Sequence, residues 1–275
     1  MIELANESLT VEVLDPVADQ GRLGTRYCTG GFIFQVRDAS RGILLSGPTF
    51  PDSYNLFDGQ GAPDAFQPHL VVKTGADGAP TTVLGIGIGL IDVKANTVVE
   101  RTRWQVDRRE GALDFRTTQE AGGWSFRLER QLTLTGRTLC SRTVLANTGE
   151  RHVPFQWYPH PFFPLYPSGE CCSFSLPVAL PENPGYELLA NGFLRMKHLP
   201  WKGTENYFQL LEYRADRPVS FLQKHPVTSL VSAVCDYVPA RLPVWGNRFT
   251  FSFEPYYERV LSPKDTARWS IRYDF

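Results

Sequence analysis

Cysteine and long apolar runs are both scarce in this sequence, which limits the kinds of protein it can be. The 275 residues include five cysteines, an odd number, and no CxxC pair or His/Cys ligand spacing indicates a metal site. We therefore expect reduced thiols and a cytoplasmic location. No apolar run approaches about 18 residues, so no membrane span is predicted. The first residues, 1-MIELANESLTVEVLD-15, carry acids and no apolar segment of a secretory signal.

An excess of charge of one sign is also lacking. With 28 Lys and Arg against 29 Asp and Glu, the net charge is −1, which gives no support for binding to nucleic acid or to an acidic membrane surface. The sequence contains neither a GxSxG nucleophile elbow nor a Walker phosphate loop. The run 85-GIGIG-89 lacks both GxGxxG spacing and a following helix, so we do not predict nucleotide binding.

The dominant pattern that is present is the alternation of apolar and polar residues. It runs through 124-WSFRLERQLTLTG-136, where only Arg130 interrupts the apolar positions, through 249-FTFSFEP-255, and through the C-terminal residues 269–275. Period-two alternation predicts strands with one buried face. No stretch of about 12 residues shows the apolar stripe of a helix. We therefore predict an all-β fold, a large antiparallel β-supersandwich, with a single domain over residues 1–275.

Further strands are predicted where β-branched and aromatic residues gather between turn residues. These candidates are 10–15, 32–38, 69–73, 98–107, 112–118, 139–147, 153–158, 207–214, 218–223 and 229–237. The segment 46-SGPTFPDSYNLFDGQGAPDAFQP-68 is long for a loop, and its aromatic residues argue against disorder. We expect it to cover or line a site.

One stretch, 155-FQWYPHPFFPLYPSG-169, combines many aromatic rings and prolines with a single histidine. Tyr158 and His160 each precede a proline, which restricts both to extended backbone geometry. If the strand continues, Gln156, Tyr158 and His160 share one polar face, opposite the apolar face that holds Trp157. The pattern predicts a histidine that is presented to a cleft from a rigid strand end.

A carboxylate in a similar setting lies near the C-terminus. In 249-FTFSFEP-255, alternation predicts that Phe249, Phe251 and Phe253 are buried while Glu254 faces the other way. Glu254 also precedes a proline, so its backbone is restrained as well. A histidine and a glutamate on two such polar faces suit paired proton transfer, in which one group gives a proton while the other takes one.

Two segments resemble motifs of the aldose 1-epimerase (galactose mutarotase-like) superfamily. The segment 145-LANTGERHVPFQWYPHPFF-163 resembles its L-x-N-T-G…P-F…x-H-P-Y/F-F signature. The ending 245-WGNRFTFSFEPYYERVLSPKDTARWSIRYDF-275 resembles its W…F-x-x-x-E-P…L-x-P-G-x…W-x-I-x-Y close, with Lys264 where those proteins more often carry glycine. The two segments cover about a fifth of the chain, and their order and separation fit the family.

The resemblance implies a β-sandwich whose concave face binds a sugar, and an isomerase that interconverts sugar anomers. Glu254 would be the general base that removes the proton of the C1 hydroxyl, and His160 the general acid that protonates the ring oxygen. The open aldehyde would then rotate about C1–C2 and close to the other anomer. The implied partner is a sugar or a sugar phosphate, and neither a metal nor a cofactor is implied.

Five further residues are candidates for binding the sugar. Gln156, Trp157 and Tyr158 precede His160 in the motif, and aromatic rings suit packing on the apolar faces of a sugar. Arg26 lies where members of the family have an early strand that faces the cleft. His69 is the only histidine upstream of the motif.

The sequence also departs from the family pattern. Many members carry another histidine well upstream, in an H-G-G or H-G-F-A-R type motif, whereas the comparable region here, 84-LGIGIGLIDV-93, has none. Two interpretations follow: an isomerase with a different sugar specificity, or a non-catalytic carbohydrate-binding protein with the same cleft. A structural interaction domain without a sugar site is a third.

Several other residues have competing interpretations. Glu258 is the rival carboxylate for the role of general base. His152, His198 and His225 are predicted to be surface or packing residues. Arg130, at an apolar position of a strand, predicts a bulge or an arginine with a partner, and a buried arginine that reaches a site is a further alternative. The sequence predicts no oligomeric state.

Overall fold

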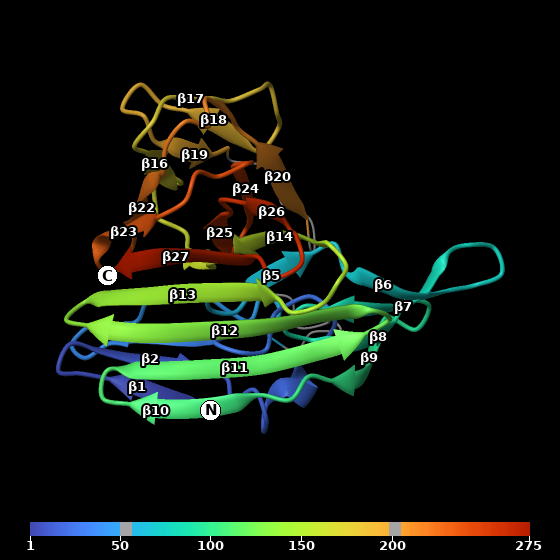
Figure 1. Cartoon of the computed structure of the whole chain (residues 1–275). Coiled ribbons are helices and arrows are strands. Elements are labelled where there is room, and N and C mark those ends of the chain that lie inside the picture. The colour runs from blue at the N-terminus through green and yellow to red at the C-terminus, as the bar shows by residue number, and fades with distance from the viewer. Residues whose placement is uncertain (50–56, 198–204) are drawn as a thin grey trace.

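The protein is built almost entirely from antiparallel strands (Figure 1). The computed structural model describes residues 1–49, 57–197 and 205–275. Within these ranges the one helical element is a short 3₁₀ turn, η1, at Gln20–Arg22. No helix among the described residues is long and apolar enough to cross a membrane. The predicted all-β class is confirmed, whereas the single domain over 1–275 stays a prediction.

The largest sheet has eight strands, and β11 to β13 are drawn as long green arrows in Figure 1. Its strands in spatial order are β10 (Gln105–Arg109), β11 (Ala112–Ala121), β12 (Trp124–Thr135), β13 (Thr138–Asn147), β27 (Thr266–Asp274), β23 (Ser229–Cys235), β22 (Ser220–His225) and β16 (Cys172–Phe174). The first four form a meander, and the C-terminal strand β27 joins it to the second half of the sheet.

Smaller sheets contribute to the same core. The sheets, each with its strands in spatial order, are β1 (Ile2–Ala5), β2 (Leu9–Val13), β3 (Ile33–Asp38) and β4 (Gly42–Ile43); β26 (Tyr257–Leu261), β14 (Val153–Pro159) and β5 (Asp64–Gln67); β15 (Phe163–Pro164), β25 (Thr250–Phe253), β24 (Pro243–Asn247) and β20 (Asn206–Leu210); β6 (Leu70–Thr74), β7 (Pro80–Gly85), β8 (Gly89–Asp92) and β9 (Thr97–Arg101); and the pairs β17 (Val178–Ala179) with β21 (Glu212–Tyr213) and β18 (Tyr186–Leu188) with β19 (Leu194–Met196). The run 85–89 spans the turn between β7 and β8, so a strand follows this turn.

The alternation seen in the sequence sets the two faces of the large sheet. Along β12 every second residue is buried, from Trp124 to Leu134, and the residues between them are exposed or half-buried. The buried face packs on the N-terminal sheet and on β14, so apolar residues from distant segments form one continuous core. Removing this apolar area from water is the main source of stability.

Two predicted strands are in fact each divided. The prediction 98–107 is wrong as one strand, because the chain leaves β9 and turns the Trp104 side chain inward, where its indole donates to the Thr29 hydroxyl, before β10 begins. The prediction 207–214 is divided in the same way, since Leu211 is buried between β20 and β21.

The predicted burial of Phe249 is also wrong. Its side chain lies before β25 and is 47% exposed, because the Asn247 carboxamide accepts hydrogen bonds from the backbone N–H groups of Phe249 and Thr250 and forms a turn there. Phe251 and Phe253 are fully buried, as predicted.

Arg130 occupies an apolar position without a bulge, since the register of β12 with both neighbouring strands is continuous. Its guanidinium forms an ion pair with Asp64 of β5 and donates to the Gly30 carbonyl and the Ser141 hydroxyl. Both ion-pair side chains are almost excluded from water, at 1% and 5% exposure. Burial raises the pKa of Asp64 to about 6, and Arg130 acts in the opposite direction. The paired interpretation of Arg130 is confirmed.

Substitution of Arg130 by Met is expected to lower the free energy of unfolding by about 3–5 kcal/mol, because it leaves the Asp64 carboxylate buried without its cation. Arg127→Met on the same strand removes an exposed ion pair with Glu129 and should cost less than about 1 kcal/mol. Chemical denaturation measures both. Adding Asp64→Asn to Arg130→Met should recover part of the loss, and equal losses in the two single variants would contradict this account.

Candidate active site

His160 is held by backbone contacts at the end of β14. The strand pairs with β26 on one side and with β5 on the other. The backbone N–H of His160 donates to the Pro63 carbonyl at 2.8 Å, and that of Phe162 donates to the Gly61 carbonyl at 2.8 Å. The described part of the predicted site-lining segment 46–68 therefore forms the backbone support of the histidine, while residues 50–56 of that segment lie outside the described residues.

The imidazole of His160 lies in a cage of aromatic rings. It stacks on Phe162 with ring centroids 4.3 Å apart, and Trp245 packs edge-on at 5.4 Å. Tyr158 and Tyr27 complete the cage at 6.2 and 6.4 Å. Among the described residues, Nδ1 of His160 has no hydrogen-bond partner. The ring is therefore fixed by packing, with one nitrogen engaged and the other available.

Glu254 meets this histidine from the end of β25. Its backbone N–H donates to the Pro243 carbonyl at 3.0 Å, and its Oε1 lies 3.3 Å from Nε2 of His160. The two side chains are only 1% and 4% exposed. The structure thus brings the two predicted catalytic residues into direct contact, although 94 positions separate them in the sequence.

Burial controls the protonation of this pair. It raises the pKa of Glu254 to about 8, although Arg26 and a hydrogen bond with Tyr256 act in the opposite direction. Burial and then the charge of Arg26 lower the pKa of His160 well below its usual value. At neutral pH the favoured state is a protonated carboxyl beside a neutral imidazole, so the pair shares one proton.

Arg26 supplies the positive charge of the site. Its Nη1 lies 3.3 Å from an oxygen of Asp58, and the hydroxyl of Tyr27 donates to the same carboxylate at 2.8 Å. Burial works against its charge, but Tyr27, Tyr158 and Asp58 raise the pKa of Arg26 above its usual value. Its side chain is still 32% exposed, whereas the pair that it acts on is enclosed.

A row of stacked groups leads from Tyr158 to the surface. The Tyr158 ring stacks on Tyr256 at 4.4 Å, and the guanidinium of Arg241 lies 4.4 Å from the Tyr256 ring. Arg241 in turn donates to Gln156 at 2.8 Å and to Glu258 at 2.6 Å. Gln156 and Glu258 therefore lie together, and Glu258 is engaged by Arg241.

Two of the predicted sugar-binding residues make no hydrogen bond or ring contact with the pair among the described residues. Trp157 is fully buried on the opposite side of β14, where it packs against Tyr237 and Trp269. Its assignment to the sugar is corrected, because strand alternation places it in the core. Nε2 of His69 lies 3.0 Å from the Thr25 carbonyl, so this histidine contacts the backbone beside Arg26.

His152 and His225 are not part of this group. His152 is exposed, and Nε2 of buried His225 bonds the Leu44 carbonyl at 2.8 Å. His198 lies outside the described residues. Among the described residues, no cluster of His, Cys, Asp or Glu could hold a metal ion. All five cysteines are free thiols.

Sequence reasoning missed Tyr27, Asp58, Trp245 and Tyr256. The last two lie inside the C-terminal segment that resembles the family, one beginning it and one following Glu254-Pro255, so their positions carried a signal. Tyr27 follows Arg26 directly. Asp58 had no local signal, because its contact with Tyr27 joins two irregular segments.

The fold is that of solved structures related to galactose mutarotase. A galactose mutarotase related enzyme from Lactobacillus acidophilus aligns with 99% of this chain and 96% of its own, at a TM-score of 0.64 and 11% identity. For a galactose mutarotase-like protein from Lactobacillus casei, the alignment covers 100% of this chain and 99% of the other, with a TM-score of 0.59 and 14% sequence identity. For a GalM/aldose epimerase homologue from C. elegans, the alignment covers 99% of this chain and 97% of the other, with a TM-score of 0.52 and 12% sequence identity. The predicted galactose mutarotase-like supersandwich is confirmed as the fold.

By sequence, no family model matches the chain, and no curated protein gives a significant match.

Glu254→Gln is expected to stabilise the protein at high pH. The folded chain keeps the Glu254 proton up to about pH 8, whereas the unfolded chain loses it near the ordinary value, so wild-type stability falls as pH rises through this window. Glutamine resembles the protonated acid and avoids that loss. Denaturation should show little difference near pH 5 and a gain on the order of 3 kcal/mol above pH 8.

Glu187→Gln serves as the matched control, since the Glu187 side chain is 40% exposed and pairs with Arg195. It should show no gain at high pH. A gain for Glu254→Gln that is the same at both pH values would contradict the raised pKa.

Proposed function

We propose that this protein is an aldose 1-epimerase-like isomerase that interconverts the anomers of a sugar or sugar phosphate. The observation that carries the proposal is the enclosed contact between His160 and Glu254, 3.3 Å apart. The fold, shared with galactose mutarotase-like structures, supports a sugar as the substrate class. The free thiols of the chain also suit the cytoplasmic location that we propose.

The chemistry needs one acid and one base at neighbouring oxygens. O1 and the ring oxygen of an aldose are bonded to the same carbon, so two catalytic groups in mutual contact can address both. In the proposal, Glu254 takes the proton of the C1 hydroxyl while His160 protonates the ring oxygen. The ring opens, C1–C2 rotates, and the reversed transfers close the other anomer.

The proton inventory of the pair fits this reversible reaction. Ring opening requires a carboxylate and an imidazolium and leaves a carboxylic acid and a neutral imidazole, which is the state favoured in the empty site. Ring closure then begins from that state. Because both states hold one proton, transfer across the 3.3 Å contact converts one into the other. Arg26 and the sugar hydroxyls would stabilise the carboxylate form when substrate is bound.

Aromatic residues and Arg26 would define the sugar-binding surface. Trp245 is half-buried beside the imidazole, and its ring suits the apolar C–H groups of a sugar. Tyr158, 3% exposed and stacked on Tyr256, packs on the other side of the imidazole. Arg26 is partly exposed beside the pair and can donate to sugar oxygens. These residues take the place that Trp157 was expected to fill. A non-catalytic carbohydrate-binding protein with the same cleft is the alternative.

Glu254→Gln and His160→Asn should each slow anomer exchange by about 100-fold or more, because each removes one proton-transfer group. NMR exchange spectroscopy on glucose, galactose and their 6-phosphates measures the rate. Glu187→Gln should leave it unchanged, and Glu258→Gln tests the rival carboxylate. Saturable sugar binding without accelerated exchange in the wild type would favour the carbohydrate-binding alternative. Neither binding nor exchange would favour a structural domain.

Arg26→Met should move the pH profile of exchange toward higher pH. The Arg26 charge lowers the pKa of both members of the pair, so its removal raises both. The alkaline limb, expected near pH 8 in the wild type because Glu254 there loses the shared proton, should shift upward by on the order of one pH unit.

Arg22→Met is the control for this shift, since Arg22 lies over the Phe57 ring and next to Asp19. An acidic shift for Arg26→Met, or an equal shift in both variants, would contradict the assigned role of Arg26.

A further inference from the structure

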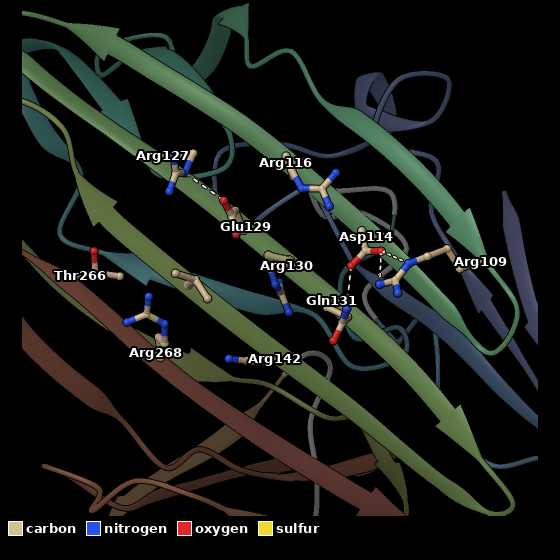
Figure 2. Close-up of a pocket in the computed structure, with 11 residues that line it drawn as sticks. Arg109, Asp114, Arg116, Arg127, Glu129, Arg130, Gln131, Arg142, Thr266 and Arg268 are labelled. Carbon is tan, nitrogen blue, oxygen red and sulfur yellow. Dashed lines mark hydrogen bonds and ion pairs between the residues drawn. The ribbon is translucent and has the colours of Figure 1, made fainter.

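The outer face of the eight-stranded sheet contains a hollow of about 330 Å³ that is rich in arginine (Figure 2). Its lining residues come from β10, β11, β12, β13 and β27 and are Arg109, Asp114, Arg116, Arg127, Glu129, Arg130, Gln131, Arg142, Val144, Thr266 and Arg268. The side chains of Arg127, Glu129 and Gln131 alternate with the buried residues of β12, so the hollow faces away from the core and from the His160–Glu254 pair.

Four of the six arginines already have a carboxylate partner. The pairs are Arg109 with Asp114, Arg116 with Asp107, Arg127 with Glu129, and Arg130 with Asp64. The last pair lies inside the core. Both carboxylates of the lining are therefore neutralised by these arginines, and Figure 2 marks their contacts with dashed lines.

Arg142 and Arg268 are the other two arginines of the lining. In the register of β13 and β27, Arg142 is opposite Ser270 and Val144 is opposite Arg268, so the two exposed arginines are diagonal neighbours on one face. Neither has an ion-pair or hydrogen-bond partner within the described ranges of the chain. The Asp236 carboxylate accepts hydrogen bonds from the backbone N–H and the hydroxyl of Ser270, each at 2.7 Å, and so is engaged by Ser270.

The arrangement of Arg142 and Arg268 favours the binding of an anion. Two guanidinium groups on neighbouring strands repel each other in the absence of a counter-charge. Each presents a planar fork of N–H donors, which matches the geometry of phosphate oxygens. Val144, small and half-buried between them, leaves space above the sheet. The volume is at the lower end of the range for small-molecule pockets, about 300–1,000 Å³.

We propose that this hollow binds the phosphate group of a small soluble metabolite, held by the guanidinium groups of Arg142 and Arg268. A long polyanion such as nucleic acid fits less well, because the other arginines of this face are paired and the net charge of the chain is −1. The site is independent of the function proposed for His160 and Glu254.

Isothermal titration with inorganic pyrophosphate tests this site. Wild-type protein should bind one equivalent, and affinity should fall as salt rises. Arg142→Gln and Arg268→Gln should each weaken binding by about tenfold or more, since each substitution removes a charge-assisted hydrogen bond to the phosphate oxygens. Arg142→Lys keeps the charge but loses the fork, so binding should weaken there too.

Arg108→Gln is the matched control, because Arg108 is exposed on β10 but is opposite Leu113, on the other face of the same sheet. It should bind pyrophosphate as the wild type does. No binding by the wild type, equal affinity in the Arg142→Gln/Arg268→Gln double variant, or equal loss in Arg108→Gln would overturn the proposal. Sedimentation with phosphatidic acid vesicles but no binding of pyrophosphate would instead indicate a lipid headgroup and also overturn it.

Discussion

The buried ion pair between Arg130 and Asp64 is the contact on which the position of the candidate site depends. It joins β12 of the large sheet to β5, and the Asp64 carbonyl accepts the N–H of Cys28 from the early segment that carries Arg26. The residue before Asp64, Pro63, holds the backbone of His160. Since separating a buried charge from its partner is far more costly than losing a surface pair, this contact fixes three segments relative to one another.

The same exclusion of water determines the chemistry of the site. In water, a glutamate and a histidine at neutral pH would be a carboxylate and a largely neutral imidazole. Enclosed by Phe162, Trp245 and the tyrosines, the pair keeps its proton on the carboxyl group instead. Arg26, at the exposed edge, opposes that effect. Its opposing charge keeps the pKa of Glu254 near the pH at which a proton must move in both directions.

Much of this could be predicted from the sequence where the signal is local. Alternation along β12 and prolines after Tyr158, His160 and Glu254 gave the strands and the restrained site residues. The failures came from contacts that join distant segments. Asn247 draws Phe249 out of the strand, and the partner of Arg130 lies on a strand, β5, that is too short and too irregularly bounded to be recognised. Trp157 was assigned to the sugar although alternation already placed it in the core.

Charged groups are in different environments on the two faces of the large sheet. This difference distinguishes the active site proposed around His160 and Glu254 from the phosphate site proposed at Arg142 and Arg268. On the inner face a charge is tolerated only with a fixed partner, so Arg130 is fully engaged and available for structure alone. On the outer face water screens charge, so Arg142 and Arg268, which have no ion-pair or hydrogen-bond partner among the described residues, are tolerated there. An unpaired guanidinium is therefore weak evidence of function where it stands alone. Here two such groups line one hollow together with Val144, and the neighbouring arginines are neutralised by carboxylates. A bound phosphate would supply the counter-charge for both.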